Sequence, residues 1–269
     1  MKTFLALLLC FAACQSVEFP FDYDLQISSI PGTNGRVMVC LHGYGGSYEI
    51  ASTVKSQEEV EATLISFNFP EYGIHEGRKY DYRKATFGTI DELLPALYVL
   101  KQVVIDQGFC SIDLYGFSAG GGALINMISV LNTSNHDERL KEIGIGALEK
   151  EKLLNAIQQG VVILDVPLKS IEEIIDFKGW SEEFDHLAKN YRNNHLRPID
   201  SLAQLKGLSL DILLYFQAND EILSNRDDAI YIENLKATQS YVTVITGNDR
   251  GHMGPHSPLW NFYFQKMSQ

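Results

Sequence analysis

The chain has 269 residues, of which 45% are hydrophobic and 21% are charged. This composition is ordinary for a globular protein and argues against a disordered chain or a multi-span membrane protein, and the length suffices for one large α/β domain. The 34 acidic and 22 basic side chains give a formal net charge of -12. Because a field of that sign repels phosphate polymers, nucleic acid is not expected as a partner.

The first residues have the pattern of an export signal. Lys2 precedes an uninterrupted apolar run from Phe4 to Ala13, and small and polar residues follow. Such a run is too short to span a bilayer as a mature helix, but it fits the central region of a signal peptide. We therefore expect residues 1–16 to be a signal and residues 17–269 to be an exported domain, in the bacterial periplasm, in the envelope or secreted.

Two fates of this signal stay open. The sequence Phe11-Ala12-Ala13-Cys14 resembles a bacterial lipobox, in which Cys14 would be acylated and would become the new N-terminus. Phe11 departs from the leucine that is usual at that position, and ordinary cleavage near Ser16 is the alternative. In the first case the acylated Cys14 would anchor the protein to a membrane.

Beyond this signal, short apolar runs alternate with helical patterns, which is typical of a parallel sheet with crossover helices. In chain order, the predicted strands are Asp24–Ile30, Arg36–Leu41, Thr63–Asn68, Ser111–Tyr115, Gly160–Asp165, Ile212–Phe216 and Tyr241–Thr246. The predicted helices are Tyr48–Glu61, Ile90–Gln107, Gly120–Leu131, Asp137–Gln159, Ser201–Lys206, Asp227–Ala237 and Pro258–Met267. We therefore expect an α/β fold with a mostly parallel central sheet and helices on both faces, in which a single strand precedes Arg36.

Two segments fit neither a strand nor a simple crossover helix. Residues 70–88 mix basic side chains with tyrosines, and a solvated loop is the simpler interpretation, with contact to an anionic or aromatic substrate group as the alternative. Residues 167–200 are rich in charged and aromatic side chains and are too long for an ordinary connection. We expect this second segment to form a small helical lid, and a surface insertion without a gating role is the alternative.

The four cysteines, at positions 10, 14, 40 and 110, form no C-x-x-C pair, so no thiolate metal site is expected. Export to an oxidising compartment raises the question of a disulfide between Cys40 and Cys110. The predicted strands place these two residues about four or five positions out of register, which exceeds the reach of a disulfide. We expect both thiols to stay reduced and buried.

The strongest chemical signal is the run Asp113-Leu-Tyr-Gly-Phe-Ser-Ala-Gly-Gly-Gly. A strand that leads through Gly116, Ser118 and Gly120 into a helix has the layout of a nucleophile elbow. Such a turn lifts the Oγ atom of Ser118 above the sheet edge, and larger side chains at the two glycines would collide with the neighbouring turn. Because the bare G-x-S-x-G pattern is common by chance, the interpretation depends on the flanking strand and helix.

Glycines follow the second predicted strand in the segment His42-Gly-Tyr-Gly-Gly-Ser. They allow backbone N–H groups to turn toward a developing oxyanion, and we select the N–H groups of Tyr44 and Ala119 as the two donors. A dinucleotide-binding loop is the competing interpretation, but Tyr48 occupies the position of its third glycine. No Gly-Lys-Ser/Thr motif indicates a phosphate-binding loop either, so no cofactor is expected.

Two later loops supply a candidate acid and a candidate base. Asp220 follows the strand that ends at Phe216, and a carboxylate there can orient a histidine. His252 lies in a glycine-bounded loop after the last predicted strand, where it can act as a general base. The order Ser118, Asp220, His252 is the order expected when the serine lies on a nucleophile elbow.

An alternative exists for each of these two residues. Asp165 ends an earlier predicted strand and is the alternative acid, although it lacks the loop context of Asp220. His256 is the rival of His252, but it lies against the start of the last predicted helix.

The HGYGGS, GFSAGGG and FQANDEIL segments, together with the GH of the last loop, resemble the α/β-hydrolase fold superfamily over most of residues 24–269. The resemblance implies acyl transfer to water through a serine ester. We therefore expect a serine hydrolase that uses Ser118, His252 and Asp220 on a small-molecule or lipid ester or thioester. The alternatives are a small-peptide hydrolase, a cofactor-free haloperoxidase and an exported binding lipoprotein without catalysis.

Overall fold

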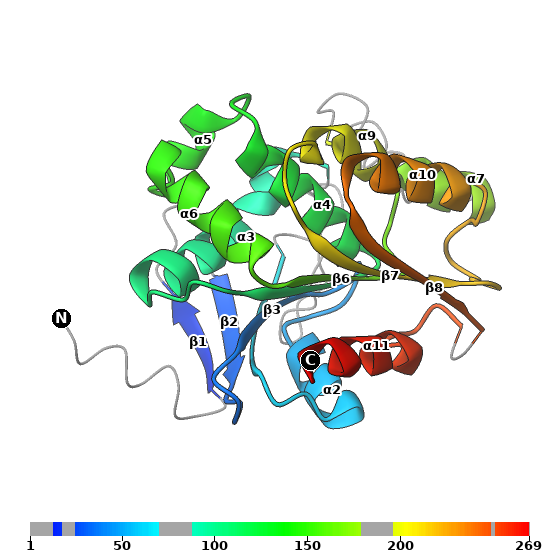
Figure 1. The fold of residues 1–269 in the computed structure, drawn as a ribbon, viewed down its shortest axis with the longest axis horizontal. Coiled ribbons are helices and arrows are strands. Elements are labelled where there is room, and N and C mark those ends of the chain that lie inside the picture. Colours follow the sequence, from blue (N-terminus) through cyan, green and yellow to red (C-terminus); the bar gives the residue numbers. More distant parts are fainter. Residues whose placement is uncertain (1–12, 18–24, 70–87, 179–195, 249–250, 269) are drawn as a thin grey trace.

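The computed structural model describes residues 13–17, 25–69, 88–178, 196–248 and 251–268. These residues form one sheet of eight strands in the order β1-β2-β4-β3-β5-β6-β7-β8 (Figure 1). β2 runs antiparallel to both of its neighbours, and each pair from β4 to β8 is parallel. The strands are β1 (Ala13–Val17), β2 (Leu25–Ile30), β3 (Val37–Leu41), β4 (Thr63–Phe67), β5 (Asp113–Phe117), β6 (Val161–Asp165), β7 (Asp211–Gln217) and β8 (Tyr241–Gly247). The mostly parallel sheet predicted from the sequence is confirmed.

The first strand departs from the prediction of a single strand before Arg36. β1 pairs with β2 from Ala13 opposite Ser29 to Val17 opposite Leu25, so two strands precede Arg36. The sequence pattern hides β1 because its residues lie at the end of the segment that reads as an export signal. Cleavage near Ser16 would remove most of this strand, and the signal itself stays a prediction.

Helices cover both faces of the sheet. In Figure 1, α2 and α11 lie on one side, and α3, α4, α6 and α10 lie on the other. The helices are α2 (Ile50–Glu58), α3 (Ile90–Lys101) with its π-helical extension η2 (Gln102–Asp106), α4 (Ala119–Asn132), α5 (Asp137–Lys141), α6 (Ala147–Gln158), α7 (Ile171–Lys178), α9 (Pro198–Ser201) with the 3-10 turn η3 (Leu202–Leu205), α10 (Asp228–Thr238) and α11 (Ser257–Met267).

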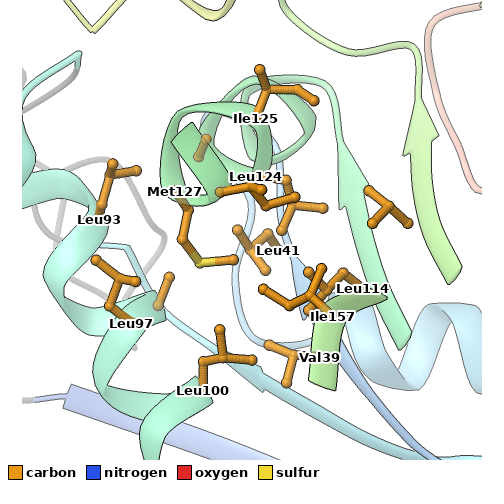
Figure 2. Packing of buried hydrophobic residues seen from close by; sticks show 14 of the residues in the cluster. Val39, Leu41, Leu93, Leu97, Leu100, Leu114, Leu124, Ile125, Met127 and Ile157 are labelled. Carbon is orange, nitrogen blue, oxygen red and sulfur yellow. The ribbon is translucent and has the colours of Figure 1, made fainter. Parts of the chain in front are cut away.

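Side chains along each central strand alternate between two apolar cores. In β3, Val39 and Leu41 pack into the larger core with α3, α4 and α6, whereas Met38 and Cys40 face the core beneath α2 and α11. Figure 2 shows Val39, Leu41 and Leu114 among side chains of α3, α4 and α6. Because both faces of the sheet are covered, the strands appear in the sequence as continuous apolar runs.

Gly144 interrupts the single helix predicted over residues 137–159. α5 ends at Lys141, Gly144 adopts a φ of 73°, and α6 begins at Ala147. A residue with a side chain rarely adopts such a φ, so the chain uses a glycine to turn between the two helices.

Cys40 and Cys110 are both free thiols, as predicted. Cys40 is fully buried in β3, and this burial raises the pKa of its thiol. The prediction that Cys110 is buried is wrong, because Cys110 is exposed. β5 begins only at Asp113, so Cys110 lies in the turn before the strand, with its Sγ atom 3.8 Å from the carbonyl oxygen of Gly108.

The start of the segment predicted to form a lid belongs to the folded body. The Nζ atom of Lys169, a buried residue, lies 2.9 Å from Glu173 Oε1 and 2.5 Å from Asp228 Oδ1, which joins α7 to α10. Residues 179–195 lie outside the described part of the chain, so the lid stays a prediction. Residues 70–87 of the basic and aromatic loop also lie outside it.

The buried carboxyl of Glu173 predicts a pH-dependent stability. Burial raises its pKa to about 7, against the opposing charge and hydrogen bonds of Lys169. The folded protein therefore keeps a proton that the unfolded chain releases above its ordinary pKa of about 4.5, so this group lowers stability as pH rises from about 4.5 to 7. Glu173→Gln is expected to remove a decrease of about 3 kcal/mol in the free energy of unfolding across that range.

Urea unfolding at pH 5 and pH 8 measures this difference. Glu138→Gln is the matched control, because the side chain of Glu138 is 89% exposed on α5. An equal pH dependence in the wild-type protein and in Glu173→Gln would contradict the prediction.

Among the described residues, no helix has both the length and the apolar character needed to cross a bilayer. In the same part of the chain, no group of three or more His, Cys, Asp or Glu residues is arranged to hold a metal ion. The expectations of no cofactor and of membrane attachment through Cys14 stay predictions.

Candidate active site

Ser118 lies in the tight turn that joins β5 to α4. Its φ of 52° and ψ of -117° are strained for a residue with a side chain. Both flanking glycines are required by close contacts: a Cβ atom on Gly116 would lie 2.7 Å from the carbonyl oxygen of Gly120, and a Cβ atom on Gly120 would lie 2.4 Å from that of Leu41. The strand and the helix expected on either side of Ser118 are both present.

The carboxyl ends of β5, β7 and β8 bring the three predicted site residues together. The Nε2 atom of His252 lies 3.0 Å from the Oγ atom of Ser118. The Nδ1 atom of the same ring lies 2.8 Å from Oδ2 of Asp220. When Nδ1 donates its proton to the carboxylate, Nε2 is left to accept the hydroxyl proton of Ser118. This arrangement can activate a serine as a nucleophile.

Asp220 is held by its own loop. Its Oδ1 atom accepts the N–H groups of Ile222 at 2.7 Å and Leu223 at 2.8 Å. Burial opposes the ionised form, but the hydrogen bond and the charge of His252, together with these two N–H groups, outweigh it and lower the pKa of Asp220. An ionised carboxylate in this position fixes the tautomer of His252 and can stabilise its protonated form.

The loop after β3 lies against the turn that carries Ser118, because a Cβ atom on Gly43 would lie 3.2 Å from the Cβ atom of Ser118. His42 holds this loop in place. Its Nδ1 atom donates to the carbonyl oxygen of Gly43 at 2.7 Å, and its Nε2 atom accepts the N–H of Phe69 at 3.1 Å. These partners give His42 a single neutral tautomer and a role in shaping the loop.

The two N–H groups predicted to bind an oxyanion lie on the segments next to Ser118. Tyr44 belongs to the loop after β3 that His42 holds. Ala119 is the first residue of α4, and the N–H groups in the first turn of a helix have no partner within the helix. The positive end of the α4 dipole adds to the attraction for a developing negative charge.

The alternative acid and the alternative base form a separate pair. Nδ1 of His256 lies 2.6 Å from Oδ1 of Asp165, and both side chains are fully buried. The carboxylate bonded to His252 is that of Asp220, and the ring bonded to Ser118 is that of His252. Asp165 and His256 therefore stand beside the site without replacing either partner of Ser118.

Sequence reasoning missed two neighbours of His252. Both carboxylate oxygens of Glu221 accept the backbone N–H of His252 at 3.0 Å. The ring of Phe117 packs against the imidazole with a centroid distance of 5.5 Å. The sequence carries no signal for the Glu221 contact, because an acidic residue after Asp220 reads as an ordinary loop position.

A small, partly open pocket adjoins the start of α4. Its lining includes Ala119, Gly122 and Asn126 of α4 and Glu92 of α3. The pocket lies beside Ala119, one of the two predicted oxyanion donors.

No protein-family model and no curated protein sequence matches this chain. Its fold, in contrast, matches solved structures over nearly its whole length. An esterase of Butyrivibrio proteoclasticus with bound ferulic acid has a TM-score of 0.62 over 94% of this chain and 100% of that chain, at 12% identity. A lipase/esterase of Lactobacillus plantarum has a TM-score of 0.62 over 95% and 98%, at 13% identity. An esterase of Pyrococcus furiosus has a TM-score of 0.55 over 99% and 89%, at 13% identity.

The chain has the α/β-hydrolase fold. In this fold a serine lies on the elbow between a strand and a helix, and the acid and the histidine follow it in that order along the chain. Ser118, Asp220 and His252 occupy these places after β5, β7 and β8.

Proposed function

We propose that this α/β-hydrolase fold protein is a serine hydrolase that cleaves a carboxylic ester. The observation that carries the proposal is the continuous chain of polar atoms from Ser118 Oγ through both ring nitrogens of His252 to Asp220. The strained backbone at Ser118 supports it, because such strain persists where function needs it. Esterases and lipases are among the proteins of similar fold, which supports an ester as the substrate.

The first half of the proposed reaction forms an acyl-enzyme. The Oγ atom of Ser118 attacks the carbonyl carbon of the ester while Nε2 of His252 takes the hydroxyl proton. The N–H groups of Tyr44 and Ala119 hold the negative charge on the carbonyl oxygen. When the bond to the alcohol oxygen breaks, the proton on Nε2 passes to that oxygen, and the acyl group remains on Ser118.

The second half releases the acid. His252 takes a proton from water, whose oxygen adds to the acyl carbon, and the same two N–H groups hold the new oxyanion. The bond to Oγ then breaks, and Ser118 recovers its proton from Nε2. Asp220 stays ionised throughout, because its role is to keep Nδ1 protonated and to stabilise the imidazolium.

A fluorophosphonate tests the proposal without a chosen substrate. We expect one covalent adduct in the intact mass of the purified protein and none in that of Ser118→Ala, because only an activated serine reacts. The absence of an adduct on folded wild-type protein would contradict the proposal and would favour a non-catalytic binding protein.

The substrate class follows from a panel of esters, thioesters and small peptides. These substrates use the same three side chains, so relative kcat/KM values separate an esterase from a thioesterase or a small-peptide hydrolase. A preference for a thioester or a peptide over every ester would contradict the ester assignment while it left the serine mechanism intact.

We also propose that the protein is exported, on the strength of the charged start and the apolar run before Cys14. The intact mass of protein purified from its host identifies the first residue of the mature chain. A mass that begins at an acylated Cys14 supports a lipoprotein, and a mass that retains Met1 contradicts export by cleavage.

A further inference from the structure

A second imidazole–carboxylate pair lies beneath the candidate active site. His256 and Asp165 are both fully buried. Nδ1 of His256 lies 2.6 Å from Oδ1 of Asp165, and the backbone N–H of His256 donates to Oδ2 at 3.1 Å. These contacts join the loop after β8 to the end of β6, across 91 residues of sequence.

Both ring nitrogens of His256 face acceptors. The partner of Nδ1 is the carboxylate of Asp165, and the partner of Nε2, at 2.9 Å, is the carbonyl oxygen of Gly251. A carbonyl oxygen cannot donate, so Nε2 carries a proton. Asp165 accepts two further hydrogen bonds on Oδ2, from the backbone N–H of His256 and from the hydroxyl of Tyr115 at 2.8 Å. Nδ1 of His256 and Oδ1 of Asp165 therefore share one proton in a short hydrogen bond.

Groups from β5 and β7 surround this pair. From β5, burial and the charge of Asp165 raise the pKa of Tyr115 well above its ordinary value, so its hydroxyl stays a donor. From β7, the ring of Tyr215 stacks on His256 with a centroid distance of 4.5 Å. Cys40 and Glu58 are two other titratable groups near Tyr115.

The contacts of His256 converge on one peptide unit. The peptide between Gly251 and His252 has its carbonyl oxygen bonded to Nε2 of His256 and its N–H bonded to the carboxylate of Glu221. Both polar atoms of the peptide that leads into His252 are thus held by side chains. Gly251 has a φ of 61°, and a Cβ atom there would lie 2.7 Å from Glu221, so the peptide has little room to shift.

Asp165 also contacts the turn that carries Ser118, the residue bonded to His252. Its backbone carbonyl oxygen accepts the N–H of Ser118 at 2.9 Å. One residue therefore contacts the turn that carries Ser118 through its main chain and, through His256, the peptide that carries His252. The distance of 3.0 Å between Ser118 Oγ and His252 Nε2 depends on both connections.

We propose that the buried Asp165–His256 pair positions His252 against Ser118 by holding the Gly251 carbonyl. His256 is a positioning residue, because it contacts the backbone of the loop and not the reacting atoms. This inference rests on the proposed serine hydrolase function, since the position of His252 matters for catalysis only if that function holds.

Two variants separate the contacts of His256. The amide of asparagine occupies roughly the place of Nδ1, so it can still donate to Asp165 but loses the contact with the Gly251 carbonyl. The longer side chain of glutamine can still reach that carbonyl. We expect His256→Asn to lower kcat and the rate of fluorophosphonate labelling by about 10- to 100-fold with little change in KM. His256→Gln is expected to stay within about 5-fold of the wild-type protein, because a conservative donor to Gly251 remains.

Tyr263→Phe is the matched control for lost stability. The hydroxyl of Tyr263 donates to Oδ2 of Asp113 at 2.8 Å, and Asp113 begins β5, at the end of the strand opposite Ser118. This variant also loses a buried hydrogen bond to a carboxylate, but its labelling rate is expected to equal that of the wild-type protein. Equal labelling rates in folded His256→Asn and Tyr263→Phe would overturn the inference.

A measurement without catalysis keeps the inference separate from the proposed function. In protein labelled with ¹⁵N-histidine, NMR is expected to show a proton on Nε2 of His256, because its partner is a carbonyl oxygen. The signal of the Nδ1 proton of His252 is expected to shift or broaden in His256→Asn and not in Tyr263→Phe. If the wild-type protein takes no fluorophosphonate, the proposed hydrolase function fails. An unchanged His252 signal in His256→Asn would overturn the positioning role, whatever the labelling result.

Discussion

Replacement of His252 by alanine is expected to lower kcat for ester hydrolysis by about 10⁴- to 10⁶-fold. Without the imidazole, no group takes the proton of Ser118, and a serine hydroxyl at its ordinary pKa is a weak nucleophile. The N–H groups of Tyr44 and Ala119 would still hold an oxyanion, so a small residual rate above the uncatalysed reaction is expected.

Fluorophosphonate labelling and turnover of the best ester in the panel both measure this effect. His136→Ala is the control for loss of an imidazole, because His136 lies at the start of α5 and not at the carboxyl edge of the sheet. Urea unfolding of each variant checks that the fold is intact. A folded His252→Ala protein that retains a tenth or more of the wild-type rate would show that another group acts as the base.

Replacement of Gly120 by alanine is expected to destabilise the protein by about 3 kcal/mol or more. The added Cβ atom would lie 2.4 Å from the carbonyl oxygen of Leu41 and 2.6 Å from that of His42. Both contacts are with backbone atoms at the end of β3, a strand paired on both edges, so relief requires α4 to move away from the sheet. The same movement would separate Ala119 from the loop that carries Tyr44, so activity is expected to fall as well.

The free energy of unfolding in urea measures this effect. Gly35→Ala is the control for an added methyl group without a steric conflict. Gly35 has a positive φ of 74°, and a Cβ atom there meets nothing within 4 Å. That variant is expected to lose only about 1 kcal/mol, the cost of placing alanine in a left-handed conformation. A loss in Gly120→Ala no larger than the loss in Gly35→Ala would show that α4 adjusts freely.

The parts of the site that depend on local backbone geometry were predictable from the sequence. A tight turn between a buried strand and a helix needs small residues at fixed positions, so Gly116 and Gly120 mark the turn at Ser118. Parallel strands end at one edge of the sheet, so the loops that carry Asp220 and His252 were expected to meet that turn. The structure brings these three side chains into contact.

The alternation of apolar runs with helical patterns likewise predicted the parallel sheet and its layers of helices. Its failures have local causes. β1 lies within a segment whose composition also fits a signal, and Gly144 ends a helix that the apolar pattern alone would continue. Cys110 is exposed because β5 begins three residues later than the cysteine.

The sequence by itself therefore determined the fold class and the residues at the nucleophile turn. It also determined the order along the chain of the loops that carry Ser118, Asp220 and His252. These features follow from short-range periodicity and backbone sterics. Only the tertiary structure decided which acid bonds to which histidine. Asp165 ends β6 and Asp220 follows β7 at the same edge of the sheet, and their partners His256 and His252 are four positions apart on one loop. Side-chain contacts between residues far apart in the chain depend on distances that only the packed sheet defines.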